Sequence, residues 1–263
     1  MKQRKKSFPY VNLFCVCIAL ILVLMCIIFA LDTPYRTSRK LIQHIEKGDI
    51  TAVEAILQDG FDPNTPTSKP SPFTALFEIS SKVPLSVACY NGDLNMVQLL
   101  IKYGATGEYQ KGTGWSPLEM TLTRYQTEDV AIIKLLLEAG ADPSFEETGR
   151  LPVFEAAGMF PNQFDAEKTN GTAFKDEYDP TIAQGITDIV VILLGDRDVN
   201  IVDYLNRTLL MEAVAVGNLY LVDYLLSIGA DPTLQDVEGR TAYDYAIQNN
   251  QDDVAQLLKK HNQ

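Results

Sequence analysis

The chain has 263 residues, of which 46% are hydrophobic and 21% charged, and its formal net charge is −12. This balance is typical of a globular protein and excludes a mostly disordered chain. The excess of acids disfavours nucleic acid or an anionic membrane surface as a partner and would attract a basic protein. The alternative is that the acidic surface only keeps the protein soluble.

The first residues combine a basic tail with a long apolar run. Residues 1–10 carry Lys2, Arg4, Lys5 and Lys6, and residues 11–31 are almost entirely apolar. A helix of that length, at ~1.5 Å per residue, covers roughly 30 Å, the hydrocarbon thickness of a bilayer. We therefore expect a transmembrane helix over residues 11–31. A cleaved signal peptide is the alternative, although its apolar core is usually only about 7–15 residues long.

The positive charges on the N-terminal side slightly outnumber those after the apolar run, which favours a cytoplasmic location for that terminus. The chain is compact and has no long low-complexity tails, which favours a bacterial source. In that case residues 32–263 are expected in the periplasm, attached to the inner membrane. If the segment is cleaved, the same residues would be secreted to the periplasm.

A unit of about 33 residues recurs along residues 32–263. The interval from Pro84 to Pro117 is 33 residues, and so is the interval from Thr208 to Thr241. Each opening is followed by apolar residues at helical spacing. Several units then end in Gly-x-Asp, as at residues 140–142 and 229–231. Ser or Thr at the opening fits a helix N-cap, proline fits the first helical turn, and glycine fits a left-handed C-cap.

This helix–turn–helix unit resembles the ankyrin repeat. The resemblance implies an all-α solenoid of about six units, preceded by the one transmembrane helix. The expected units are about 36–64, 80–107, 111–144, 147–200, 203–233 and 236–263. No unit has the full Thr-Pro-Leu-His opening of the family, because the histidine position holds Ser86, Glu119, Phe154, Met211 and Asp244. The family's Thr–His hydrogen bond is therefore lost, and stacking between units must supply the stability.

Two insertions interrupt the period, at residues 65–79 and 158–185. Long loops in a compact array are usually functional or disordered. The second insertion interleaves acids such as Asp176 and Glu177 with aromatic residues such as Phe174 and Tyr178. This mixture favours a contact loop, with a flexible linker as the alternative.

The residues offer little for catalysis. His44 and His261 are the only histidines and have no fitting nucleophile nearby in the sequence. Cys89 occupies a small-residue position in a first helix, where we expect a buried apolar side chain. No phosphate-binding glycine loop and no metal-ligand spacing is present. We therefore expect no enzyme activity, no cofactor and no metal.

A row of candidate contact residues follows from the resemblance. Ankyrin proteins bind partners through the hairpin tips and the concave surface of the first helices. The tip positions before the openings hold Lys82, Trp115, Arg150, Arg207 and Arg240, with Tyr204 beside them and Tyr90 at the end of a first helix. Trp and Arg are enriched at binding hot spots. The alternative is that Arg and Trp are simply ordinary residues at this position in the family.

These features predict a non-catalytic protein that binds another protein at a membrane. An immunity protein or inhibitor that neutralises a secreted effector in the bacterial periplasm is one form of this function. A scaffold or helper for an endogenous envelope enzyme is the alternative. The argument for either rests on fold-level analogy and topology.

Overall fold

The computed structural model describes residues 33–68, 82–110, 115–123, 125–144, 151–159 and 179–261. Among these residues, no helix is both long and apolar enough to cross a bilayer. The predicted transmembrane helix at residues 11–31 lies outside the described part of the chain, as do residues 69–79 of the first insertion and 160–178 of the second.

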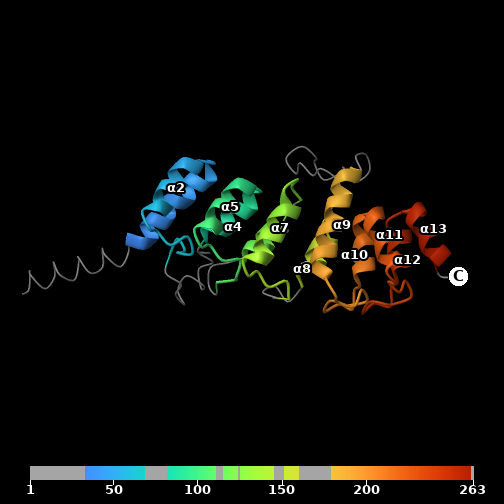
Figure 1. The fold of residues 1–263 in the computed structure, drawn as a ribbon. Helices are drawn as coiled ribbons and strands as arrows, with labels where there is room; N and C mark the ends of the chain where they lie inside the picture. Colours follow the sequence, from blue (N-terminus) through green and yellow to red (C-terminus); the bar gives the residue numbers. More distant parts are fainter. Residues whose placement is uncertain are drawn as a thin grey trace, which may run out of the picture.

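The described residues form helix pairs stacked in chain order, from residues 33–46 at one end to α13 at the other (Figure 1). Residues 33–46 pair with α2 (Ile50–Gln58). The following pairs are α4 (Pro84–Asn91) with α5 (Leu94–Lys102), α6 (Pro117–Thr121) with α7 (Asp129–Glu138), α8 (Pro152–Ala157) with α9 (Pro180–Leu194), α10 (Leu209–Val216) with α11 (Leu219–Ser227), and α12 (Ala242–Gln248) with α13 (Asp252–His261). Within the described ranges the only β-structure is a single antiparallel bridge between Val202 and Thr208. The prediction of an all-α solenoid is therefore confirmed.

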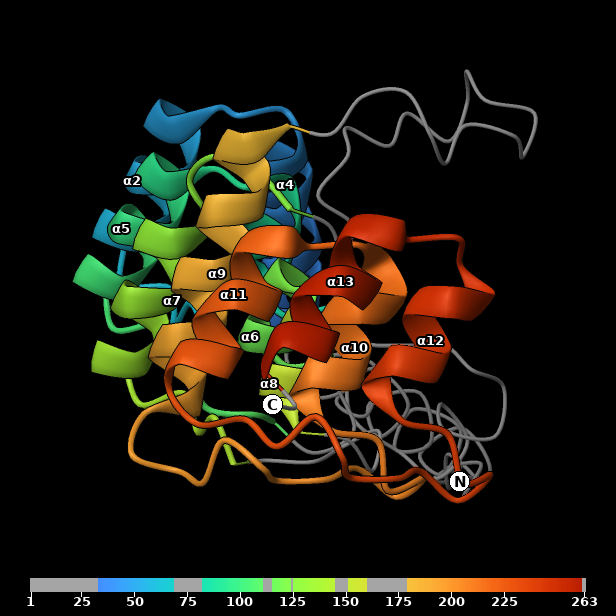
Figure 2. The same ribbon diagram turned by 90° about the vertical axis from the view of Figure 1, so that its right-hand side faces the viewer.

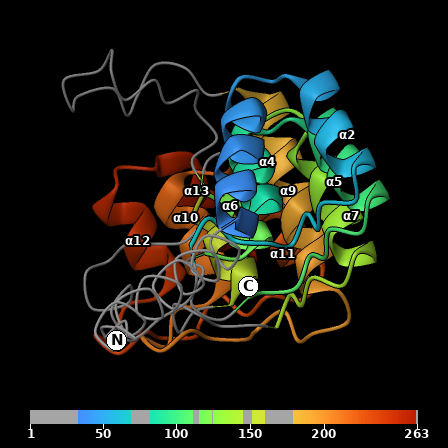
Figure 3. The ribbon, with the colours of Figure 1, turned by 90° about the vertical axis from the view of Figure 1, so that its left-hand side faces the viewer.

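The first and second helices of the pairs form two layers with the core between them (Figure 2). First helices contribute small buried residues such as Ala88, Ala157 and Ala213. Second helices contribute larger ones such as Ile133 and Leu225. Small residues let the first helices approach one another closely, while the branched side chains fill the space between layers. Seen from the opposite end, the same two layers continue to residues 33–46 (Figure 3).

Compact turns join the helices within three of the pairs. Asp49, Asp93 and Asn218 cap the second helices, accepting hydrogen bonds of 3.0–3.1 Å from the backbone N–H three residues later. Glycine precedes each cap, and Gly92 and Gly217 adopt the left-handed conformation that ends a first helix. These side-chain caps satisfy N–H groups that a helix start leaves without a partner.

Asparagine side chains connect the loops of successive pairs. The Asn64 amide donates to the carbonyl of Gly104 and accepts from the N–H of Thr106. Asn200 makes the same pair of contacts with Gly229 and Asp231 near the other end of the chain. Because each unit buries its apolar face only against neighbours, such cross-unit bonds add directly to stacking.

Two units replace the family's missing Thr–His hydrogen bond with a different one. Glu119 and Asp244 occupy the histidine position, and each closes a capping box with the Ser116 or Thr241 that begins its helix. The acid accepts from the cap residue's backbone N–H, and the cap side chain accepts from the acid's own N–H. The loss of histidine in these units is therefore compensated locally.

The α8–α9 pair departs most from the regular unit. Its second helix begins at Pro180, with the Asp179 side chain as N-cap, and continues for 15 residues. Residues 180–185, which the sequence placed in the second insertion, thus lie in α9. The helix begins this early because an aspartate N-cap and a proline at the first helical position both favour the start of a helix.

Candidate protein-binding surface

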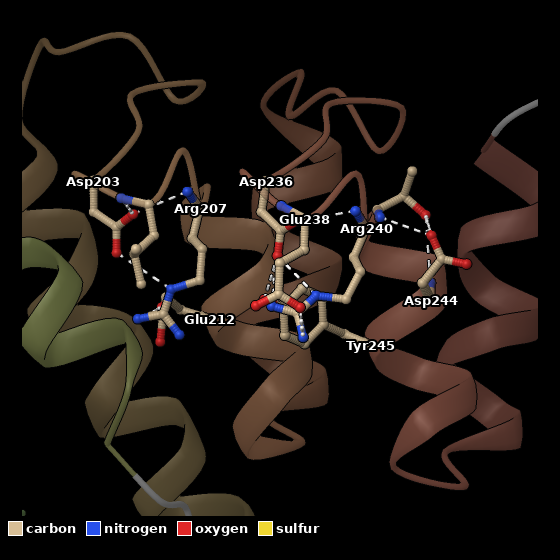
Figure 4. Close-up of polar contacts among 10 residues, drawn as sticks. Asp203, Arg207, Glu212, Asp236, Glu238, Arg240, Asp244 and Tyr245 are labelled. Atoms are coloured by element: carbon tan, nitrogen blue, oxygen red, sulfur yellow. Dashed lines mark hydrogen bonds and ion pairs between the residues drawn. The ribbon is translucent and has the colours of Figure 1, made fainter.

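The loops before α10 and α12 are two hairpin tips built on a buried aspartate. Asp203 accepts hydrogen bonds of 2.9 Å from the backbone N–H groups of Leu205 and Arg207. Asp236 does the same for Glu238 and Arg240, also at 2.9 Å (Figure 4). Asn206 and Gly239 provide the positive φ that the chain needs to turn back at these points. The tight tips are therefore determined by an Asp-x-x-Asn/Gly-Arg pattern.

The two arginines of this pattern point inward along their own loops. Arg240 donates from Nε to Asp236 at 2.9 Å and from Nη2 to the Tyr245 hydroxyl at 2.9 Å. Tyr245 in turn donates to Asp236 at 2.7 Å. Arg207 donates to Asp203 at 3.3 Å and forms an ion pair of 2.7 Å with Glu212 on α10 (Figure 4). Arg207 and Arg240 thus hold the tips together from inside.

The electrostatics of these loops follow from the same contacts. Burial raises the pKa of Asp236, but the hydrogen bonds from Arg240, Tyr245 and Glu238 outweigh it and hold the pKa well below its ordinary 3.8. Burial lowers the pKa of Arg207, and the neighbouring Glu212 and Asp203 reverse this and raise it. Asp236 and Arg207 therefore both carry their charge at neutral pH.

Large apolar side chains project from the outside of the same tips. Tyr204 is 71% exposed and Val237 is 58% exposed, each directly after the buried aspartate of its loop. Val202 is 47% exposed on the other side of Asp203. The two loops are neighbours, because the N–H of Val237 donates to the carbonyl of Leu205 at 3.0 Å. Tyr204, Val202 and Val237 are thus exposed apolar residues on two adjoining loops, and together they are here called the tip surface.

Trp115 lies at the equivalent tip before α6, where the later loops carry arginine. Its side chain is 52% exposed, and its carbonyl accepts a 3.3 Å hydrogen bond from the Ser86 hydroxyl on α4. The backbone is thereby held by the preceding unit while the indole remains accessible. This placement agrees with the exposed tip position that the sequence suggested.

The remaining predicted contact residues are placed as follows. Lys82 pairs with Glu46 at 2.9 Å, and both side chains are exposed. Tyr90 is 42% exposed at the end of α4, and its carbonyl accepts from Gln126. Arg150 lies outside the described residues. The structure brings Tyr204 next to Arg207 but leaves Lys82, Tyr90 and Trp115 in other units.

Sequence reasoning missed Val202 and Val237. The signal was present, because both flank the aspartate of an Asp-x-x-Asn/Gly-Arg turn, where the backbone is fixed and alternate side chains face outward. Neither valine belongs to the buried core. Ordinary loop residues there would be polar.

The groups that could have carried chemistry have structural surroundings. Cys89 is fully buried, and burial raises the pKa of its thiol to about 12. His44 Nδ1 lies 3.2 Å from Asp49, beside the first turn of α2. Across the described ranges, no group of three or more His, Cys, Asp or Glu side chains is arranged to hold a metal ion.

The stacked helix pairs define a helical repeat solenoid. The family model for ankyrin repeats (3 copies) matches residues 41–147 and 181–263, well over half of the chain. The protein therefore belongs to the ankyrin-repeat family, whose repeats form protein-interaction modules.

Individual relatives match at low identity. Human palmitoyltransferase ZDHHC13 is 28% identical over 183 residues, which are 68% of this chain and 25% of that protein, and the orangutan (Pongo abelii) protein matches equally. A putative ankyrin repeat protein of Rickettsia bellii is 28% identical over 123 residues, 42% of this chain and 51% of the relative. The chain thus spans a quarter of the palmitoyltransferases and half of the bacterial protein.

Proposed function

We propose that this protein captures a partner protein with its tip surface and Trp115, and that residues 11–31 hold it at a membrane. The observation that carries the proposal is the exposure of Tyr204, Val202 and Val237 on loops whose backbones are fixed by buried Asp203 and Asp236. Exposed apolar side chains on rigid loops lose little conformational entropy when a partner covers them. Tyrosine and tryptophan are also the residue types that dominate binding hot spots.

Sequence features support the proposed membrane location and the proposed kind of partner. The basic tail and the apolar run of residues 11–31 fit an inner-membrane anchor with residues 32–263 in the periplasm. There the protein acts as an immunity protein or inhibitor that binds a secreted effector. The net charge of −12 favours an effector with a basic surface.

The binding proposal is tested by comparing the wild type with Tyr204→Ser and Trp115→Ser in affinity capture from the native cell, with each captured protein quantified by mass spectrometry. The matched control is Ile228→Ser, which removes an apolar side chain that is 41% exposed at the C-cap of α11, away from the tips. We expect a captured partner to fall by about tenfold or more in the tip variants, in line with the loss of a hot-spot residue. The control should capture as the wild type does.

The same variants should leave folding intact, with the free energy of unfolding changed by less than about 0.5 kcal/mol, because exposed side chains contribute little to stability. Equal capture by all variants would show that the tip surface is not the contact. For the membrane part, protease added to spheroplasts should degrade residues 32–263. Protection of these residues would contradict a periplasmic location, and a neighbouring gene product whose toxicity the protein fails to suppress would contradict the immunity role.

A further inference from the structure

A groove of about 570 Å³ lies between α7 and α9, at the turns that join first to second helices. Its lining includes Tyr125 and Val130 on one side, Gln184 and Asp188 on α9, and Tyr220 at the start of α11. The tips lie where the first helices begin, so this α7–α9 groove is at the opposite end of the helix pairs. It is distinct from the tip surface.

The groove exists because two turns depart from the compact form. Gly-Asp or Gly-Asn turns join α4 to α5 and α10 to α11, but residues 122–128 form a longer connection between α6 and α7. On the other side, α9 has 15 residues where α7 has 10, and it extends past its neighbours (Figure 1). The longer turn carries Tyr125, and the longer helix supplies the facing wall.

Tyr125 lies directly against the backbone of α9. A Cβ built at Gly185 would overlap the Tyr125 hydroxyl and ring. Glycine is a poor residue inside a helix, and here its lack of a side chain is what lets the tyrosine lie on the helix. Tyr125 therefore lines the groove with its ring against the α9 backbone at Gly185.

The groove is electronegative. Among the described residues that line it, Asp188 is the charged one, and it accepts a 2.9 Å hydrogen bond from Gln184. Burial raises the pKa of the Tyr125 hydroxyl, and the carboxylates of Asp129, Asp188 and Asp179 raise it further. A carboxylate beside tyrosine rings is the setting in which proteins bind an ammonium or guanidinium group, through an ion pair and cation–π contact together.

We propose that the α7–α9 groove receives a lysine or arginine side chain from a basic segment of a partner protein. The occupant is argued from charge complementarity: Asp188 lines the groove, and the chain as a whole carries a net charge of −12. The proposal rests on the proposed function, since the cation belongs to a bound protein. It adds a second contact at the end of the units away from the tips.

The test uses isothermal titration calorimetry. The full chain, in a non-ionic detergent and low salt, is titrated with an acetylated, amidated tetra-arginine peptide. Asp188→Asn should weaken binding about three- to fivefold, the effect of one accessible ion pair. Asp223→Asn, which removes an exposed acid from α11, is the matched control and should weaken binding by less than about twofold. Tyr220→Leu should weaken it as well, because it removes a ring and no charge.

Three results would overturn the proposal. The first is that the wild type does not bind the peptide. The second is that Asp188→Asn and Asp223→Asn weaken peptide binding equally, which would show that the peptide is attracted only by the net charge of the chain. Alternatively, Arg124→Gln could bind the peptide more tightly than the wild type, which would identify the chain's own Arg124, outside the described residues, as the groove's cation. Tyr204→Ser is expected to bind the peptide normally. If the peptide titration fails while the tip variants still lose the captured partner, the groove proposal is wrong and the proposed function is unaffected.

Discussion

The two C-terminal units and the two central units solve the same problem of loop geometry in different ways. In the C-terminal units, Asp203 and Asp236 each fix a tip through backbone and arginine contacts, and a short Gly-Asn turn joins α10 to α11. In the central α6–α7 unit, Trp115 replaces the arginine, Lys111 occupies the position of the aspartate, and a seven-residue connection carries Tyr125. The C-terminal loops are regular and held by hydrogen bonds and ion pairs, whereas the central loops are irregular.

The difference shows which positions of a repeat are needed for stacking and which are available for other uses. The buried positions of the helices are the same in both regions, with Leu118 and Ile133 in the centre matching Leu210 and Val222 near the end. The loops diverge because only their backbone contacts matter to the stack. Rigid C-terminal loops can display Tyr204 and Val237 at low entropic cost, whereas the irregular central turns open a groove.

The largest expected effect comes from breaking the C-terminal network. Asp236→Ala leaves the backbone N–H groups of Glu238 and Arg240 and the Tyr245 hydroxyl without their acceptor. We expect a loss of about 2–3 kcal/mol in the free energy of unfolding, measured by urea denaturation. The control is Asp142→Ala in the central region, where the exposed aspartate accepts only from Ser144, and its cost should stay below about 1 kcal/mol.

The position of the single tryptophan sharpens this experiment. Trp115 fluorescence reports on the central units, while circular dichroism reports on all helices. Asp236→Ala should shift the circular dichroism transition more than the fluorescence transition, because repeats interact mainly with their neighbours. Identical shifts of both signals would mean that the solenoid unfolds as one unit and that the two regions are not energetically separable.

A smaller effect is expected from Gly185→Ala in the irregular region. Glycine to alanine inside a helix normally stabilises by about 1 kcal/mol. Here the new methyl would overlap the Tyr125 ring, so we expect destabilisation by about 1–2 kcal/mol, typical of an overpacked site. The double variant with Tyr125→Ala removes the overlap, and in it the alanine at 185 should become neutral or stabilising. Destabilisation by the alanine in both backgrounds would contradict the contact.

Much of the fold was predictable because its determinants are local. Proline at 117 and 152, the caps at Ser116 and Thr241, and glycines 140 and 229 mark helix starts and ends by their backbone preferences alone. The start of α9 at Pro180 was assigned to the insertion, since an irregular acidic stretch obscures where a helix begins. The transmembrane helix stays a prediction.

The surface was predictable only in part. The tip positions follow from the repeat period, and Tyr204 and Trp115 are exposed as expected. The period does not reveal that Arg207 and Arg240 turn inward, because that depends on an aspartate four residues earlier and on Glu212 and Tyr245 from the following helices. The groove was not predictable either, since it depends on how far α9 extends relative to α7.

The smallest expected effect is a pH dependence of the stability that Asp236 contributes to the C-terminal units. The native pKa of Asp236 is held below its ordinary 3.8, so the aspartate contributes stability that is complete above about pH 4 and is lost as the pH falls toward the native pKa. Asp236→Asn has no carboxylate to titrate. The stability difference between wild type and this variant should therefore be constant from neutral pH to about pH 5 and narrow below about pH 4. A difference for Asp236→Asn that does not change with pH would mean that its carboxylate gains nothing from Arg240 and Tyr245. The tip would then be held by backbone geometry and not by charge.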